Sequence, residues 1–244
     1  RSTYLQKSKH AIVGLEYDVN DKWSVNVEAY VKYFSQLINL NRKKLYEDNQ
    51  NNYDIADEIK KDFIVESGLA KGLDFLVKYN DQQVSLWMVY SLGKVSRTDA
   101  FGTYAPHYDR RHNVNFVGSY VFGKDRSWTL DARWNFGSGF PFTKTQGYYE
   151  SLTFEDGIAT DVTQSNDELG VLYADYNLGQ MPAYHRMDVS IRKQIKFSKR
   201  SVLETIFSVS NLYDRANIFY YDRITDSRIN QLPLMPTIGA NWQF

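Results

Sequence analysis

The stretch Thr237-Ile-Gly239-Ala-Asn-Trp242-Gln-Phe244 decides the fold that this sequence predicts. Apolar and polar residues alternate through it and through the residues just before it. The apolar set is Leu232, Leu234, Pro236, Ile238, Ala240, Trp242 and Phe244. The facing set is Gln231, Thr237, Gly239, Asn241 and Gln243. A period of two residues is the pattern of a β-strand with two unlike faces. Such a strand, finishing on an aromatic, fits a wall between lipid and water better than a soluble protein, where that end would fray.

The same alternation recurs along the chain and predicts nine strands and no helix. The segment 128–136 shows it most cleanly, with Trp128, Leu130, Ala132, Trp134 and Phe136 against Thr129, Asp131, Arg133 and Asn135. The other strands are expected at 11–19, 23–33, 73–79, 84–92, 114–122, 187–197, 203–209 and the C-terminal stretch. The predicted fold class is therefore all-β.

Connections of two lengths alternate between these strands. Tight turns are expected at 20–22, 80–82, 123–126 and 198–200, and long loops at 41–62, 96–108 and 138–182, with a moderate one near 223–228. This alternation is typical of an antiparallel up-and-down transmembrane β-barrel, with short periplasmic turns at one rim and long extracellular loops at the other. A Greek-key sandwich would mix its connection lengths. The remaining alternative is a soluble sheet whose aromatics form a core.

Composition excludes several classes of protein. The chain has 244 residues with 29 basic and 29 acidic side chains, so it lacks the net positive charge that is typical of nucleic-acid-binding proteins. It has no cysteine, which excludes disulfides and thiolate chemistry. No run of 18 apolar residues occurs, which excludes a transmembrane helix. Aromatic residues reach 16%, and those near strand ends are expected to form interfacial girdles.

Nine strands cannot close a bacterial barrel, because such barrels have an even strand number. Two unpaired edges are also not tolerated in lipid. We therefore expect residues 1–244 to be the C-terminal part of a larger barrel. The remaining barrel strands would come from the same protein, joined through an extracellular loop.

Several motifs follow one another in a recognisable order: Tyr108-Asp-Arg-Arg-His-Asn-Val-Asn115, Trp134-Asn-Phe-Gly-Ser-Gly-Phe-Pro-Phe-Thr143, Pro182-Ala-Tyr-His-Arg-Met-Asp188, Ser210-Asn-Leu-Tyr-Asp-Arg-Ala-Asn217 and Pro236-Thr-Ile-Gly239. Together they resemble the C-terminal part of a TonB-dependent outer-membrane receptor of the Bacteroidota type. The resemblance implies a 22-stranded barrel with an N-terminal plug, in the cell outer membrane of a Gram-negative bacterium. No plug or TonB box stands in these residues, so energy coupling is implied by the resemblance alone.

The implied function is import of a scarce nutrient, such as an iron chelate, a vitamin or a glycan, with energy from the TonB complex. The implied partners are the plug, the TonB complex, the barrel-assembly machinery, outer-membrane lipid and a surface lipoprotein. Gly239, Trp242 and Phe244 match the signal that the assembly machinery recognises in this family. The alternatives are a non-transporting barrel that scaffolds an outer-membrane complex, and an aromatic-rich adhesin.

Charged residues on the polar face are candidates for the lining of the barrel lumen, chiefly Asp131, Arg133, Arg186 and Asp188. Charges at membrane depth must face water or protein. They either line a ligand path or form a mixed-sign structural network, and the structural interpretation is favoured for any single residue.

The long loop 138–182 is the main candidate for ligand contact. It carries Tyr148, Tyr149, Phe154, Tyr173 and Tyr176 among acidic residues, and aromatic rings there can stack on a sugar or a chelate. The alternative is a solvated loop whose aromatics pack on their neighbours. Arg110 and Arg111 either hold an anionic ligand group or pair with Asp109 or another carboxylate.

No enzyme, cofactor or metal is expected. The sequence has no Gly-x-Ser-x-Gly elbow, no phosphate-binding glycine loop and no His-Glu-x-x-His. The four histidines lack the spacing of metal ligands.

Overall fold

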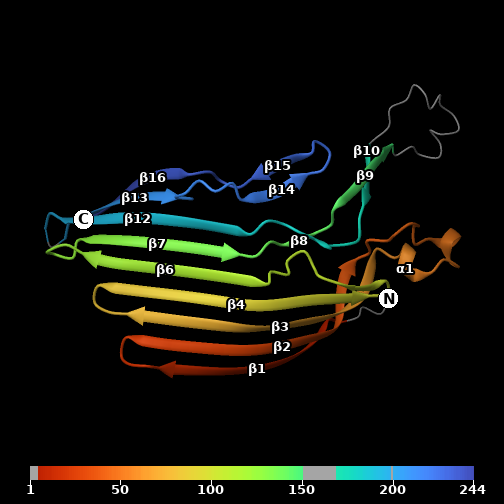
Figure 1. Ribbon diagram of the computed structural model, residues 1–244, viewed down its shortest axis with the longest axis horizontal. Coiled ribbons are helices and arrows are strands. Elements are labelled where there is room, and N and C mark those ends of the chain that lie inside the picture. The colour runs from red at the N-terminus through yellow and green to blue at the C-terminus, as the bar shows by residue number, and fades with distance from the viewer. Residues whose placement is uncertain (1–4, 151–168, 199) are drawn as a thin grey trace.

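One antiparallel sheet dominates the computed structural model, which describes residues 5–150, 169–198 and 200–244 (Figure 1). Its nine main strands lie side by side in chain order. They are β1 (Lys7–Asp18), β2 (Trp23–Leu40), β3 (Phe63–Asn80), β4 (Val84–Asp99), β6 (His112–Phe122), β7 (Trp128–Gly137), β12 (Tyr184–Lys196), β13 (Val202–Ser210) and β16 (Met235–Gln243). The nine strands predicted from the alternation are confirmed, and sequence neighbours are hydrogen-bonded neighbours throughout.

Short turns gather at one end of the sheet and long connections at the other (Figure 1). We call these the turn end and the loop end. The loop predicted at 41–62 fills the whole interval between β2 and β3. The turns are built from local side-chain contacts. Asn20 Oδ1, for example, accepts hydrogen bonds from the backbone N–H groups of Lys22 and Trp23, at 2.9 and 3.0 Å.

Several predicted boundaries are wrong in detail because the loops carry secondary structure of their own. The 41–62 connection contains the 3-10 turn η1 (Gln50–Asn52) and the helix α1 (Asp57–Lys60), although no helix was expected. The 96–108 loop is shorter, since β4 runs to Asp99 and β5 (Gly102–Tyr104) folds back on it. The 138–182 loop contains β8 (Pro141–Phe142), β9 (Thr145–Glu150), β10 (Leu169–Tyr173) and β11 (Gly179–Gln180).

The final connection also differs from the prediction. The residues near 223–228 form the tip of a hairpin made by β14 (Ile218–Asp222) and β15 (Ser227–Asn230). β16 begins at Met235, so Leu232 and Leu234 lie outside the strand. Side chains from the preceding bend hold them there, because Asn211 Nδ2 donates to the Leu232 carbonyl and Asp214 Oδ1 accepts from the Leu234 N–H.

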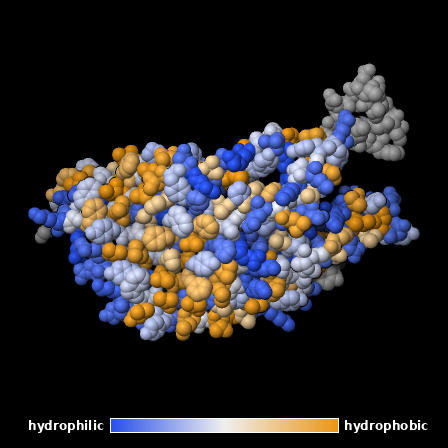
Figure 2. Space-filling model, in the orientation of Figure 1, coloured by the Kyte–Doolittle hydropathy of each residue, from blue (hydrophilic) through white to orange (hydrophobic). Residues whose placement is uncertain are grey.

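The two faces of the sheet differ as the alternation predicts. On β7, Trp134 stands opposite Phe116 and Met187, whereas Arg133 stands opposite Val117 and Asp188. We call the first the apolar face and the second the polar face. In Figure 2, hydrophobic residues gather over the strand region. No apolar side chain in the described residues is buried, so the sheet has no hydrophobic core of its own.

Aromatic side chains of the apolar face are concentrated at the turn end. The ring centroids of Trp23 and Tyr79 are 4.7 Å apart, and those of Phe122 and Trp128 are 6.1 Å apart. Phe197, just beyond the end of β12, and Trp242 on β16 continue the row, with ring centroids 6.4 Å apart. This row stands where a girdle was predicted. None of the helices in the described part of the chain is long and apolar enough to cross a membrane.

The sheet is open at both edges. In the described residues β1 pairs only with β2, and β16 pairs only with β13. Each edge strand therefore presents unpaired backbone N–H and C=O groups, which favour pairing with a further strand.

Gly72, in the middle of the sheet, lies so close to its neighbours that a substitution there tests the fold. A Cβ on Gly72 would lie 2.6 Å from both the Leu92 carbonyl oxygen and the Tyr30 hydroxyl. Gly72→Ala should lower the free energy of unfolding by about 1–3 kcal/mol through overpacking. Thermal unfolding followed by circular dichroism would measure the loss.

Gly14→Ala is the matched control, because its Cβ would meet the nearest atom at an ordinary 3.7 Å. Equal melting temperatures for the two variants would contradict the packing of Tyr30 over Gly72.

Candidate functional site

The predicted lumen residues lie together on the polar face of β7 and β12. Arg186 binds Asp188 through two hydrogen bonds, of 2.8 and 2.7 Å. Arg192 lies 2.9 Å from Asp131. Arg133 stands opposite Asp188 in the ladder. Two of the three arginines are thus paired with aspartates, which fits the interpretation as a mixed-sign structural network, and a role in lining a ligand path stays a prediction.

The predicted loop aromatics have been drawn into contacts within the chain. Tyr148 donates a hydrogen bond to the Arg223 carbonyl, and the Tyr173 ring lies 5.1 Å from the Arg223 guanidinium. Tyr149 covers Gly170, which stands opposite it on β10. Tyr148 and Tyr173 thus tie the β9–β10 pair to the β14–β15 hairpin. Phe154, the other aromatic predicted here, lies outside the described residues.

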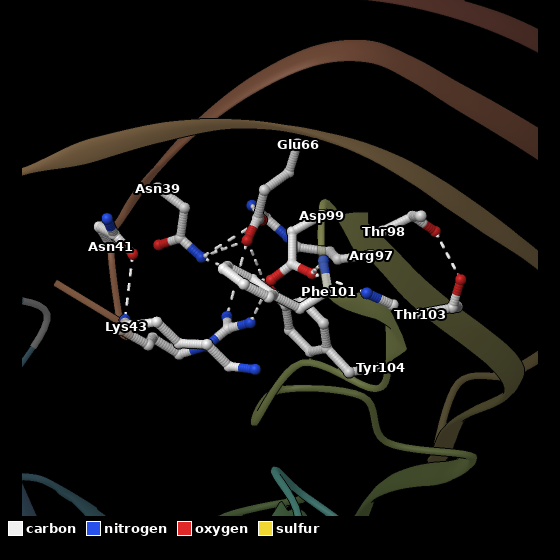
Figure 3. A network of polar contacts seen from close by, with 12 residues as sticks. Asn39, Asn41, Lys43, Glu66, Arg97, Thr98, Asp99, Phe101, Thr103 and Tyr104 are labelled. Atoms are coloured by element: carbon white, nitrogen blue, oxygen red, sulfur yellow. Dashed lines mark hydrogen bonds and ion pairs between the residues drawn. The ribbon is translucent and has the colours of Figure 1, made fainter. Parts of the chain in front are cut away.

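Tyr176 belongs to a second cluster at the loop end, centred on Glu66. The Glu66 side chain is fully buried, 0% exposed. Its carboxylate accepts from the Tyr104 hydroxyl at 2.7 Å, from Arg97 at 3.2 Å and from Asn39 at 3.2 Å (Figure 3). The alternation gave no warning of this cluster, because Glu66 looks like any other residue of the polar face.

Arg42 joins the connection 41–62 to this cluster. Its guanidinium lies 2.6 Å from Asp99 and 3.6 Å from Glu66. The rings of Tyr104 and Tyr176 lie 4.1 and 4.0 Å from its central carbon. Two carboxylates and two aromatic rings thus hold one cation, which anchors the long connection to β3 and β4.

Burial shapes the acid–base chemistry of the cluster. Burial first, and then the hydrogen bond to Glu66, raises the pKa of Tyr104 to about 12. The hydroxyl therefore stays protonated at neutral pH and remains a donor to the carboxylate. For Arg42, burial alone would lower the pKa, but the contacts with Tyr104, Tyr176 and Asp99 raise it.

A cavity of about 640 Å³ lies at the loop end, and we call it the arginine pocket. Arg110, Arg215 and Arg228 line it together with His107, and no carboxylate does. Its apolar walls come mainly from Phe140, Phe142, Tyr184 and Phe219. The pocket opens where the polar face ends, because Tyr184 stands opposite Gly137 and Arg110 covers that glycine.

None of the three arginines of this pocket makes an ion pair in the described residues. Arg110 stacks on Phe140 at 4.0 Å, and Arg215 donates to the Ala183 carbonyl at 3.0 Å. In the described residues, the only buried side-chain nitrogen or oxygen atoms without a hydrogen-bond partner are Nε of Arg110 and Nε of Arg215. Burial lowers the pKa of Arg110, with Tyr184 offsetting part of the effect. An arginine nevertheless stays charged, so the pocket is suited to an anionic group.

The structure gives Arg110 and Arg111 different surroundings, although the sequence could not decide whether they hold an anionic ligand group or pair with a carboxylate. Arg111 lies 3.9 Å from Asp109, as one interpretation expected. Arg110 makes no ion pair in the described part of the chain and keeps its potential to hold an anion. The signal was present in the sequence as a run of two arginines, but only the structure assigns them to different surroundings.

The predicted assembly signal lies at the free edge of the sheet. Phe244 is 98% exposed and Trp242 is 62% exposed. Trp242 also donates from its indole nitrogen to Ser201 Oγ at 3.0 Å. A Cβ on Gly239 would meet no atom within 4 Å. The role of these residues stays a prediction.

In the described residues, no group of three or more histidine, aspartate or glutamate side chains is arranged so that it could hold a metal ion. The histidines instead lie against aromatic rings: His10 on Phe34, His107 on Tyr108, His112 on Tyr90 and His185 on Tyr213.

Comparison with known proteins finds solved structures with a similar fold, but no relative by sequence. No family model matches the sequence, and no curated protein does. Several solved structures match nearly the whole chain. Three of them are the ferripyoverdine receptor of the outer membrane of Pseudomonas aeruginosa (TM-score 0.62, 12% identity, 98% of this chain and 27% of that chain), the ferric citrate transporter FecA (0.61, 13%, 97% and 31%) and the ferric-catecholate import receptor Fiu from E. coli (0.61, 12%, 98% and 28%).

At these identities the likeness establishes the fold, an antiparallel β-sheet like that of the outer-membrane receptors. The chain spans less than a third of the length of each of these structures.

The Glu66 cluster can be tested without knowledge of a ligand. Glu66→Gln removes the charge that compensates Arg97 and part of Arg42, so local opening of the 41–62 connection should become about 2 kcal/mol easier. Hydrogen exchange of its backbone amides would report the change.

Glu47→Gln is the matched control, because Glu47 lies in the same connection with its side chain 77% exposed and paired only to Lys44 in the described contacts. Unchanged exchange in the Glu66 variant would show that the cluster does not anchor the connection.

Proposed function

We propose that this chain is the C-terminal part of the barrel of a TonB-dependent outer-membrane receptor, which imports a scarce nutrient into a Gram-negative bacterium. In this proposal residues 1–244 supply nine neighbouring strands of a closed barrel of about 22 strands. The other strands and the plug belong to the same protein. The Bacteroidota type is part of the proposal and rests on the sequence motifs.

One observation carries the proposal: the sheet has an uncovered apolar face and a charged opposite face. A two-faced sheet in water would have to bury its apolar face against a second layer. The described residues supply no such layer, and Val13 and Ile238 are 76% and 83% exposed. Lipid on one side and water on the other satisfy both faces at once. The open edges support a larger ring, because lipid does not tolerate unpaired strands.

The loop end would be extracellular, and ligand would enter there. The matching structures are described as a ferripyoverdine receptor, a ferric citrate transporter and a ferric-catecholate import receptor, which makes an iron chelate the first substrate class to test, before a vitamin or a glycan. TonB would supply the energy through the plug. Assembly would use Gly239, Trp242 and Phe244.

The arginine pocket is the ligand contact that the geometry favours. A buried cation without a counter-charge is costly, and an anionic group of the ligand would relieve that cost for Arg110 and Arg215. The aromatic walls would pack against a planar part of the ligand. This site replaces Tyr148, Tyr173 and Tyr176 as the leading candidate, because those rings already hold other parts of the chain.

The alternative is a barrel that scaffolds an outer-membrane complex without transport. The same tyrosine contacts favour it, since they brace the loop-end hairpins through contacts within the chain. A surface lipoprotein would be the expected partner at the loop end.

Deletion of the full-length gene tests transport against scaffolding. Growth should fail on one limiting nutrient, most directly an iron chelate, and recover when the gene is restored. Uptake of the radiolabelled nutrient would measure transport itself. Normal growth on limiting iron, cobalamin and glycans, together with loss of a partner protein from the outer membrane, would favour the scaffold.

Substitution of the pocket arginines tests the ligand site. Arg110→Gln with Arg215→Gln in the full-length protein should weaken uptake at low nutrient concentration by roughly tenfold or more, because hydrogen bonds to charged groups are worth about 1.5–3 kcal/mol. Uptake at saturating nutrient should change less.

Arg126→Gln with Arg200→Gln is the matched control, since both residues lie in turns at the opposite end of the sheet. An unchanged concentration dependence in the pocket variant would remove the arginine pocket from the ligand path.

A further inference from the structure

Two lysines stand directly opposite each other on the apolar face of β3 and β4. Lys71 pairs with Lys94 in the ladder, and both side chains are exposed. Like charges directly opposite one another destabilise a sheet. Neither lysine makes an ion pair in the described residues.

A groove of about 540 Å³ runs beside this pair, and we call it the lysine groove. Its apolar part is lined by small and branched side chains, including Ala11, Ala29, Leu73 and Leu92. Lys71, Lys94 and Arg111 form its charged part, and no carboxylate lines it. Arg111 is only weakly compensated, because its nearest carboxylate oxygen, on Asp109, is 3.9 Å away.

The charged part lies where the continuous apolar run of β3 and β4 ends. Along β3 the side chains of this face are apolar from Tyr79 through Leu73, and Lys71 interrupts this run before Leu69. Along β4 they are apolar from Leu86 through Leu92, and the next one is Lys94. An apolar run of this length covers most of the roughly 25 Å apolar band of a membrane barrel. In the proposed outer-membrane placement, the long lysine side chains can reach the lipid head groups on the loop-end side from this position.

We propose that the lysine groove binds a phosphate-bearing lipid of the outer leaflet. The lipid phosphates would lie between Lys71, Lys94 and Arg111, and one acyl chain would lie along Ala11, Ala29 and Leu73. This proposal rests on the proposed placement in the outer membrane. It is independent of transport, because the groove is on the opposite face from the arginine pocket.

Charge complementarity selects a lipid over the other occupants. A second copy of the chain docked by the same surface would bring the three cations against three more, since a two-fold contact must be self-complementary. Free phosphate would meet the cations but leave the adjoining apolar groove unfilled. A lipid offers an anionic head and an apolar tail in the order in which the groove presents its charged and apolar parts.

The test uses the full-length protein reconstituted in nanodiscs of phosphatidylcholine mixed with lipid A or with dephosphorylated lipid A. Native mass spectrometry of the released protein measures which lipid stays bound. Lipid A should be retained over its dephosphorylated form. Lys71→Gln with Lys94→Gln should reduce that preference about fivefold for each lysine and roughly twenty-five-fold for the pair.

Two further variants make the result specific. Lys22→Gln with Lys124→Gln removes the same charge from turns at the opposite end and should leave the preference unchanged. Lys71→Arg with Lys94→Arg keeps the charge and should keep the preference. Heat-modifiable migration in detergent and cell fractionation, measured separately, report folding and outer-membrane placement, so failure of the lipid site is distinguishable from failure of the proposed function.

Several outcomes would overturn the proposal. They are equal retention of both lipids by the wild-type protein, an undiminished preference in the double glutamine variant, loss of lipid A on addition of inorganic phosphate alone, and a dimer that the double glutamine variant abolishes.

Discussion

The structure depends on one constraint: the sheet has an apolar face that the described chain does not cover. Cohesion within the sheet comes from the backbone ladder and from cross-strand side-chain pairs, such as Trp134 between Phe116 and Met187. Neither supplies the burial that normally drives folding. The surroundings must therefore provide the apolar contact, and the alternation of side chains fixes which face receives it. If a strand shifted its register by one residue, its charged side chains would move from the polar face to the apolar face.

Charge at the loop end is arranged in two ways. Around Glu66 it is compensated inside the chain, by Arg97, Arg42 and the hydroxyl of Tyr104. This arrangement fixes the connections that stand above the sheet. In the arginine pocket and the lysine groove the described residues leave cations without equal numbers of anions. Removing one partner of the buried Glu66 cluster would leave a charge without compensation, which is costly, whereas the cations of the pocket and the groove remain able to bind an anionic group from outside the chain.

The sequence predicts the sheet well and the loop end poorly, for a physical reason. Strand alternation is local, so 128–136 and its neighbours could be placed from their own residues. The contacts of Glu66 join positions far apart in the chain, and those of Tyr176 with Arg42 do so even more. No short window contains both partners. The sequence therefore could not decide whether the tyrosines of 138–182 contact a ligand or pack on their neighbours, and in the structure Tyr148 and Tyr173 lie against Arg223. Arg110 and Arg111 were recognised as candidates, but their surroundings could not be distinguished.

These two consecutive arginines connect the proposals for the two faces. Residues that are neighbours in an extended chain point to opposite sides. Arg110 accordingly covers Gly137 on the polar face and lines the arginine pocket, whereas Arg111 lines the lysine groove beside Lys94. The Arg111 carbonyl accepts a hydrogen bond from the Gly93 N–H at 3.0 Å, which fixes the dipeptide to β4 at this level. One short segment thus places a cation on each side of the wall, and the backbone bond that holds it makes the position of one depend on the position of the other.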